Sequence, residues 1–137
     1  MCGIVGILEK NNKEITVDEL SKFRDSLSHR GPDNSGIFIN KKKNLGLGHR
    51  RLSIIDLTNN ANQPLVFDNR YYLVFNGEIY NYQIIKKELR ELGHKFITSS
   101  DSEVLLKSYI QWGENCQFKF NGMWAFAIWD DLKKKLF

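Results

Sequence analysis

Cysteine is scarce in this 137-residue chain, which contains only Cys2 and Cys116. They form no C-x-x-C spacing of the kind that binds zinc, so we expect no metal site and two reduced thiols, as in a cytoplasmic protein. No apolar run approaches the roughly 20 residues of a membrane-spanning helix. The first residues also lack the basic and apolar regions of a signal peptide, so we expect a cytoplasmic protein without a membrane partner.

A strong excess of charge is lacking as well. Lys and Arg number 20 and Asp and Glu number 16, which leaves a formal net charge of +4. The runs 41–43 and 133–135 adjoin expected strand ends, where lysines discourage pairing between sheet edges. No interleaved aromatic residues or known binding motif accompany them, so we predict no nucleic-acid partner. No glycine-rich phosphate loop, repeat or linker is evident, and we expect one domain and no bound cofactor.

The hydrophobic pattern predicts an α+β fold. Residues 2–8 are nearly all apolar and are typical of a strand buried on both faces. Residues 16–28 are predicted to form a helix that opens with a Thr16–Glu19 capping box. The Asn76-Gly77 pair is typical of a hairpin turn, although the next residues lead into a helix. The remaining predicted strands are 37–40, 45–49, 71–75, 95–98, 123–129 and 133–137, and the remaining predicted helices are 82–92 and 100–112.

Cys2 has an unusual chemical context if Met1 is removed. It then carries a thiol, whose thiolate form is the nucleophile, beside a free α-amine with a reference pKa of about 7.7–8.0. One residue could then supply both the nucleophile and the general base. The alternative is that Cys2 is a small apolar residue in a buried first strand.

Six motif regions together carry a resemblance to a known family. They are 1–6 (MCGIVG), 29–36 (HRGPDNSG), 48–57 (GHRRLSIIDL) with 63–64 (QP), 76–81 (NGEIYN), 100–106 (SDSEVLL) and 122–130 (GMWAFAIWD). In order and spacing they resemble the glutaminase domain of class II glutamine amidotransferases, and most of all that of the glutamine-hydrolysing asparagine synthetases. The resemblance covers essentially the whole chain. It implies an N-terminal-nucleophile hydrolase fold, a four-layer αββα sandwich, cut short at its C-terminal end.

The resemblance also implies roles for single residues. Cys2 would attack the side-chain amide of glutamine and form a thioester, and its own α-amine would relay protons. The Asn76 side chain and the Gly77 N–H would form the oxyanion hole. Arg51 would bind the substrate carboxylate, and Glu78 and Asp101 its ammonium group. The implied glutamine-binding set is Arg51, Leu52, Ser53, Ile54, Ile55, Asn76, Gly77, Glu78 and Asp101.

The residue types suit these roles. The planar guanidinium of arginine matches a carboxylate with two parallel hydrogen bonds, and acidic groups suit an ammonium. Taken singly, each residue has a plainer interpretation: Asn76-Gly77 as a turn, Asp101 as a favourable first-turn residue, Arg51 as a surface side chain. We expect His29, His49 and His94 to be structural and Cys116 to be inert.

The resemblance implies a larger protein in which residues 1–137 are the N-terminal glutaminase domain. Its ammonia would pass to a synthetase domain outside this chain, which would use ATP and Mg²⁺ to convert aspartate to asparagine. A homodimer is an open expectation. Two alternatives stay open: the same glutaminase serving another acceptor, and a non-catalytic binding or regulatory domain.

Overall fold

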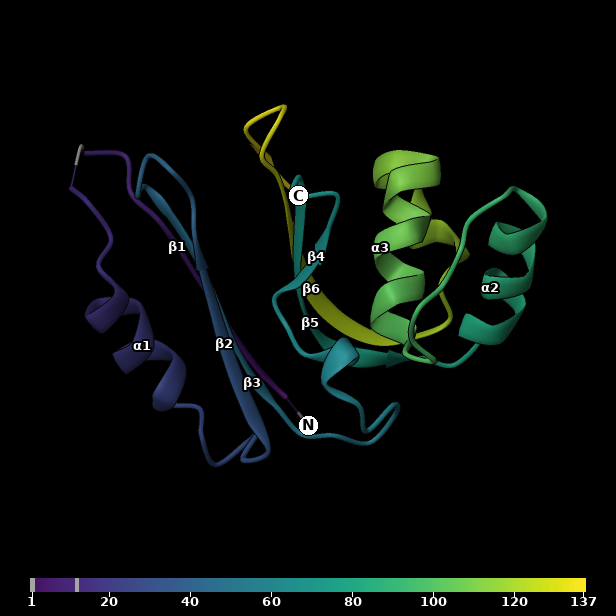
Figure 1. Ribbon diagram of the computed structural model, residues 1–137, viewed down its shortest axis with the longest axis horizontal. Coiled ribbons are helices and arrows are strands. Elements are labelled where there is room, and N and C mark those ends of the chain that lie inside the picture. The colour runs from purple at the N-terminus through teal and green to yellow at the C-terminus, as the bar shows by residue number, and fades with distance from the viewer. Residues whose placement is uncertain (1, 12) are drawn as a thin grey trace.

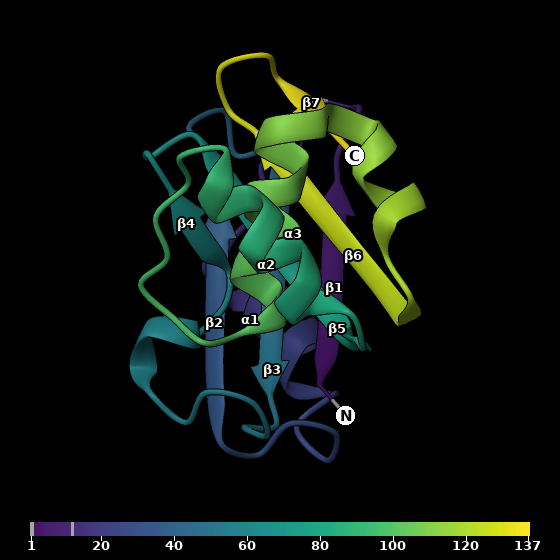
Figure 2. The ribbon, with the colours of Figure 1, turned by 90° about the vertical axis from the view of Figure 1, so that its right-hand side faces the viewer.

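The computed structural model describes residues 2–11 and 13–137 as two antiparallel sheets packed face to face (Figure 1). Helix α1 (Val17–Asp25) covers the outer face of one sheet. Helices α2 (Tyr82–Glu91) and α3 (Asp101–Trp112) lie on the outer side of the other (Figure 2). The predicted four-layer α+β sandwich is thereby confirmed. Met1, whose removal is predicted, lies outside the described residues.

The first sheet has the order β1-β3-β2, with β1 (Gly3–Leu8), β2 (Asn34–Ile39) and β3 (Leu45–Arg51). The central strand β3 is buried along almost its whole length. Strand β1 is an edge strand and only partly covered, and Leu8 is 50% exposed. The prediction of a first strand buried on both faces is therefore wrong, because the central position, which receives the most cover, belongs to β3.

Helix α1 is shorter than predicted. Its start is as expected, since the Thr16 hydroxyl accepts a hydrogen bond from the Glu19 N–H (3.1 Å). It ends at Asp25 because the backbone then changes to i→i+3 hydrogen bonds, beginning with the Leu27 N–H to the Arg24 carbonyl. Within α1 only Leu20 is fully buried, whereas Phe23 is 54% exposed.

The second sheet has the order β4-β5-β6-β7, with β4 (Leu65–Phe67), β5 (Tyr71–Ile79), β6 (Gly122–Asp130) and β7 (Lys135–Leu136). Strand β5 runs straight through Asn76 and Gly77, which pair with Ala125 and Trp124 of β6. The prediction that this strand ends at residue 75 is therefore wrong, and the turn that the Asn76-Gly77 pair allows does not form, because pairing with β6 holds both residues extended.

The predicted strand at 95–98 is also wrong. The backbone N–H groups of Ile97 and Thr98 donate to the carboxylate of Glu103 instead of to a neighbouring strand. Glu103 lies in the first turn of α3, which Ser100 caps as predicted by accepting from the Glu103 N–H. Strand β4 and two short 3-10 helices, η1 (Asn59–Ala61) and η2 (Gly113–Lys119), were not predicted. In the described part of the chain, no helix is long and apolar enough to cross a bilayer.

Candidate active site

The layer between the sheets changes from apolar to polar toward one end. On β3, Leu45 and Leu47 point into this layer and are almost completely buried. Side chains on a strand alternate between its two faces, so His49 and Arg51 continue the same inward face. Both are also buried, with exposed fractions of 1% and 5%. The end of β3 therefore places a neutral polar group and a cation inside the sandwich.

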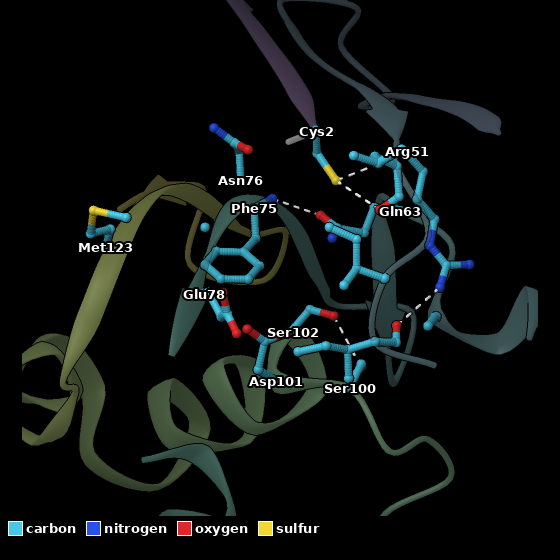
Figure 3. A pocket seen from close by; sticks show the side chains of 15 residues that line it. Cys2, Arg51, Gln63, Phe75, Asn76, Glu78, Ser100, Asp101, Ser102 and Met123 are labelled. Atoms are coloured by element: carbon cyan, nitrogen blue, oxygen red, sulfur yellow. Dashed lines mark hydrogen bonds between the residues drawn. The ribbon is translucent and has the colours of Figure 1, made fainter. Parts of the chain in front are cut away.

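Strands β5 and β1 make the same change at the same end. On β5, Val74 belongs to the apolar layer, and the next residues on that face are Asn76 and Glu78. On β1, Ile4 packs against the layer, so Cys2 follows it on the same face. Figure 3 shows the Cys2 thiol and the Asn76 side chain at the same end of the cavity.

These side chains line a cavity of about 110 Å³, which is larger than a single water molecule needs. Of the ten predicted site residues, nine line it and Ser53 does not. The Ser53 N–H instead donates to the Asp33 carboxylate (2.7 Å). The residues that line the cavity are Cys2, Arg51, Leu52, Ile54, Ile55, Ala61, Gln63, Phe75, Asn76, Gly77, Glu78, Ser100, Asp101, Ser102 and Met123.

Cys2 is held by contacts on both its side chain and its backbone. The Leu52 N–H donates to Cys2 Sγ (3.4 Å), and the Cys2 thiol lies 3.6 Å from the Leu52 carbonyl oxygen. The Arg30 guanidinium donates to the Cys2 carbonyl (3.0 Å). The thiol is thus fixed at the cavity wall while it remains partly exposed.

One edge of β5 is open where it borders the cavity. Strand β4 covers this edge only as far as Leu73, which pairs with Leu65, the first residue of β4. Beyond that point side chains take over as partners of the β5 backbone. The Phe75 N–H donates to Gln63 Oε1 (2.6 Å), and the Phe75 carbonyl accepts from His49 Nε2 (3.2 Å).

Gly77 lies between two residues whose backbone groups point to this open edge. The Ile79 N–H donates to Asp101 Oδ2 (3.1 Å), as the Phe75 N–H donates to Gln63. The register between β5 and β6 is constant, so Gly77, two residues from each, directs its N–H to the same edge. Among the described residues, no side chain accepts a hydrogen bond from this N–H. It therefore forms a free donor at the cavity wall.

Asn76 brings a second polar group to the cavity. Its Oδ1 atom is buried and has no hydrogen-bond partner among the described residues. Buried polar atoms of this kind are uncommon in folded proteins and call for an explanation such as a bound ligand. Rotation about the terminal dihedral angle, which exchanges the oxygen and the NH₂ group, would break no bond of that oxygen. The side chain can thus present two N–H donors to a bound molecule.

Arg51 lines the cavity, but its terminal nitrogens already have partners. Nη1 donates to the Thr58 carbonyl (2.8 Å) and to Asn62 Oδ1 (2.7 Å). Nη2 donates to the Asp56 carbonyl and lies 3.5 Å from the Ile55 carbonyl oxygen. In this arrangement the guanidinium holds the loop 55–62, and a substrate carboxylate would have to replace some of these oxygens.

Asp101 and Glu78 make the opposite wall acidic. Burial raises the pKa of the Asp101 carboxyl, and the nearby Glu78 raises it further, while hydrogen bonds from the Ile79 N–H and from the first turn of α3 oppose the shift. A bound cation would stabilise the ionised form of Asp101 and so offset the cost of its burial.

Asp56 joins the Arg51 loop to the start of α3. One carboxylate oxygen accepts from the Thr58 hydroxyl (2.6 Å) and N–H, and the other accepts from the Ser99 N–H (2.8 Å). These hydrogen bonds, led by that from the Thr58 hydroxyl, lower the pKa of Asp56 to about 2. The loop is therefore tied to the second half of the chain, near the cavity.

Sequence reasoning missed several of the lining residues. Gln63, Ser100, Ser102 and Met123 fall within the quoted motifs, and their presence there was the available signal. Ala61 and Phe75 lie outside those motifs and carried no such signal.

Cys116 and His94 do not line the cavity, whereas His49 is hydrogen-bonded to the Phe75 backbone beside it. Cys116 is fully buried, and burial raises the pKa of its thiol to about 11. His94 pairs with Gln111 (2.7 Å) and does not line the cavity. Burial, with a smaller contribution from the neighbouring Arg51, lowers the pKa of His49 to about 4 although the hydrogen bond to the Phe75 carbonyl opposes the shift, so this imidazole is neutral near pH 7.

Comparison with known proteins gives consistent results. The profile of one family, the glutamine amidotransferase domain, matches residues 1–137. Asparagine synthetase [glutamine-hydrolyzing] 1 of Bacillus subtilis (strain 168) is 43% identical over 134 residues, covering 95% of this chain and 21% of that protein. Asparagine synthetase [glutamine-hydrolyzing] 3 of the same organism is 38% identical over 141 residues, covering 100% of this chain and 22% of that protein.

Among solved structures, glutamine phosphoribosylpyrophosphate amidotransferase from B. subtilis shares the fold with a TM-score of 0.73 at 21% sequence identity. The similarity covers 93% of this chain and 35% of that chain. This chain thus spans about a fifth of the length of the two asparagine synthetases.

Proposed function

Because this chain belongs to the glutamine amidotransferase domain family, we propose that it hydrolyses the side-chain amide of glutamine to glutamate and ammonia, with Cys2 as the nucleophile. The observation that carries the proposal is the meeting of three groups at one cavity. The Cys2 thiol from the first sheet shares that cavity with Asn76 and with the free N–H of Gly77 from the second.

The chemistry follows from these positions. The Cys2 thiolate attacks the amide carbon, a C–S bond forms, and the carbonyl oxygen becomes an oxyanion. Asn76 and the Gly77 N–H donate hydrogen bonds to that oxygen, and losing one such donor typically costs about 10²–10³ in rate. Protonation of the nitrogen releases ammonia and leaves a thioester. Water then attacks the thioester through a second oxyanion, and glutamate leaves.

The α-amine of Cys2, freed by removal of Met1, serves as the base and acid in these steps. Its reference pKa lies close to neutral pH, which is where a proton relay works best. No separate histidine is needed, and His49, whose pKa is about 4, is occupied by the Phe75 carbonyl.

The two ends of glutamine's amino-acid group are recognised by opposite charges. Glu78 and Asp101 bind the ammonium, and Arg51, with the backbone of the loop that follows it, binds the carboxylate. The carboxylate then replaces loop oxygens that Arg51 contacts in the unliganded protein. A substrate that lacks the ammonium binds poorly, because the buried Asp101 carboxylate would remain without a partner cation, and one that lacks the carboxylate forgoes the ion pair with Arg51.

We further propose that this domain supplies ammonia to a synthetase domain of the same parent protein. The two B. subtilis relatives are named as glutamine-hydrolysing asparagine synthetases, and this chain matches about a fifth of each. In that assignment asparagine is the product, ATP and Mg²⁺ bind the synthetase domain, and the protein acts in the cytoplasm. The expectation of no cofactor or metal in residues 1–137 stays a prediction, as does the homodimer.

The test is to treat the full-length parent protein with a diazo-ketone analogue of glutamine, which alkylates a thiolate with loss of N₂, and to locate the adduct by mass spectrometry. We expect one adduct on Cys2, with Met1 absent. Cys116→Ala should label normally, because that thiol is buried, and Cys2→Ala should neither label nor hydrolyse glutamine. Retained Met1 with no adduct, or glutaminase activity in Cys2→Ala, would overturn the proposal.

A further inference from the structure

Two side chains form hydrogen bonds with the Phe75 backbone, one with its N–H and one with its carbonyl. Gln63 accepts from its N–H at 2.6 Å, and His49 donates to its carbonyl at 3.2 Å. Both side chains are buried, with exposed fractions of 7% and 1%. We infer that His49 and Gln63 are positioning residues that set the geometry of the Asn76 and Gly77 donors through the Phe75 backbone. This inference rests on the proposed function.

These two hydrogen bonds act directly on the backbone that carries the Asn76 and Gly77 donors. The Phe75 carbonyl belongs to the same peptide group as the Asn76 N–H, and Asn76 pairs with Ala125 of β6 on the opposite edge. His49 therefore holds one side of this peptide group and β6 the other. The next peptide group bears the Gly77 N–H, which faces the cavity, and Asp101 then holds Ile79. The Gly77 N–H thus has no hydrogen-bond partner among the described residues, whereas side chains hold the backbone on either side of it, at Phe75 and at Ile79.

The two hydrogen bonds also explain why β5 stays extended beyond Leu73, where its pairing with β4 stops. The last residue of β4 on this side is Leu65, which pairs with Leu73. Without a neighbouring strand, the Phe75 N–H and carbonyl would be buried without partners, which is costly. Gln63, two residues before Leu65, supplies the acceptor, and His49 supplies the donor from the facing sheet. The two side chains take the place of one further residue of β4.

The chemistry of His49 suits this task. A carbonyl oxygen only accepts hydrogen bonds, so the Nε2 atom must carry a proton, and in the neutral ring Nδ1 is then unprotonated. Nδ1 is buried and has no partner within the described residues. Burial also keeps the ring neutral near pH 7, since it lowers the pKa to about 4. His49 therefore gives a fixed neutral donor and adds no charge beside the reaction centre.

The test compares variants of the full-length protein by their glutaminase kinetics per active site, counted by labelling with the diazo-ketone. His49→Leu removes the donor and should lower kcat about 10–100-fold, since small displacements of catalytic groups cost rates of this order. The glutamine KM should change less than about threefold, because the donors contact the oxyanion rather than the bound amino-acid group. His49→Gln, which retains an N–H donor, should restore most of kcat.

Two further variants distinguish a role in positioning the donors from a general loss of packing between the sheets. Gln63→Met removes the acceptor on the other side of Phe75 and should lower kcat in the same way. Leu47→Ala changes a residue on the same face of β3 and makes a cavity in the same layer, but Leu47 belongs to a different core cluster from Phe75. Its kcat per active site should equal that of the wild type.

The outcomes are distinguishable from those of the proposed function. An inactive wild-type protein would refute the glutaminase assignment itself. An active wild type with unchanged kcat in both His49→Leu and Gln63→Met, or with an equal loss in Leu47→Ala, would overturn only the positioning role. If His49→Leu does not fold, the kcat values of Gln63→Met and His49→Gln test the positioning role. A lowered kcat in Gln63→Met with most of kcat kept in His49→Gln supports it, and an unchanged kcat in Gln63→Met overturns it.

Discussion

Asp101 combines a structural hydrogen bond with the role in substrate binding that we propose for it. Its carboxylate accepts the Ile79 N–H and so supports the end of β5. It also lines the cavity, and burial raises its pKa above the usual range. Below this raised pKa the carboxyl is neutral and attracts no ammonium group, whereas above it the group is ionised and buried. A bound ammonium is the partner that would stabilise that charge.

The first prediction concerns Asp101→Asn. The amide can still accept from the Ile79 N–H but carries no charge, so glutamine binding should weaken by about 2–5 kcal/mol, roughly 30-fold or more in KM. In the wild type, KM should rise as the pH falls through the raised Asp101 pKa, and this rise should be lost in the variant. Steady-state kinetics across pH, with stability followed in parallel, measure both effects. A variant with the wild-type KM and pH dependence would contradict the ammonium-binding role.

At the scale of elements, strand β5 organises the site. Its residues alternate between the helix-facing core and the inter-sheet layer, while its N–H groups alternate between β6 and the open edge. Gly77 allows this strand to pass very close to β6. A Cβ atom at Gly77 would lie 2.3 Å from the Met123 carbonyl oxygen and 2.7 Å from the Trp124 Cα. No side chain fits there without a shift of the strand.

The second prediction is therefore that Gly77→Ala displaces β5 from β6 and lowers kcat at least about 100-fold, the typical effect of losing one oxyanion donor. Gly6→Ala is the matched control, because its Cβ would meet only the Leu47 side chain, at 3.7 Å. That variant should retain activity. Glutaminase kinetics and thermal unfolding of both variants provide the measurement, and full activity in Gly77→Ala would refute the oxyanion role of this strand segment.

At the scale of the whole molecule, the site depends on how the two sheets face each other. The proposed nucleophile Cys2 directly precedes β1 of one sheet, and the proposed oxyanion donors Asn76 and Gly77 lie on β5 of the other. The layer between them is held by apolar contacts, including the stacked rings of Phe38 and Tyr72, whose centroids lie 3.6 Å apart. At the polar end, His49 makes the hydrogen bond that crosses between the sheets.

The third prediction is a loss of stability in mild acid. The unfolded chain protonates His49 near its reference pKa of about 6.5, whereas the folded protein does so only at about 4. Between these values the unfolded state binds more protons, so the free energy of unfolding falls as the pH falls from about 6.5 to 4. The loss should approach about 3 kcal/mol, because each pKa unit corresponds to about 1.4 kcal/mol.

Denaturant unfolding at several pH values measures this effect, with His49→Gln as the comparison. The difference between the two proteins isolates the histidine from other groups. Asp56 and Asp130, whose pKa values are lowered to about 2, titrate below this range. Equal pH dependence in the wild type and the variant would show that His49 is not held neutral by burial.

Much of the local structure could be predicted because its causes lie within a few residues. Thr16 and Ser100 cap helices whose first turns contain their hydrogen-bond partners, three positions away. The first half of β5, residues 71–75, and strand β6 have strong strand-forming composition. The motifs around Cys2, Arg51, Asn76 and Asp101 carried the family resemblance, and with it the residues that meet at the cavity.

The remaining features could not be predicted because their causes lie far apart in the chain. Asn76-Gly77 has the local preference of a turn, but pairing with β6 across some 50 residues keeps it extended. Residues 95–98 have the sequence pattern of a strand, but the N–H groups of Ile97 and Thr98 donate to the Glu103 carboxylate and not to a neighbouring strand. The sequence alone was enough to identify the family and to predict the reactive groups. Only the packing of the two sheets determined that the edge of β5 stays open, that His49 and Gln63 support it, and that the Gly77 N–H remains free, because backbone hydrogen bonds at a sheet edge depend on whichever groups the tertiary fold brings there.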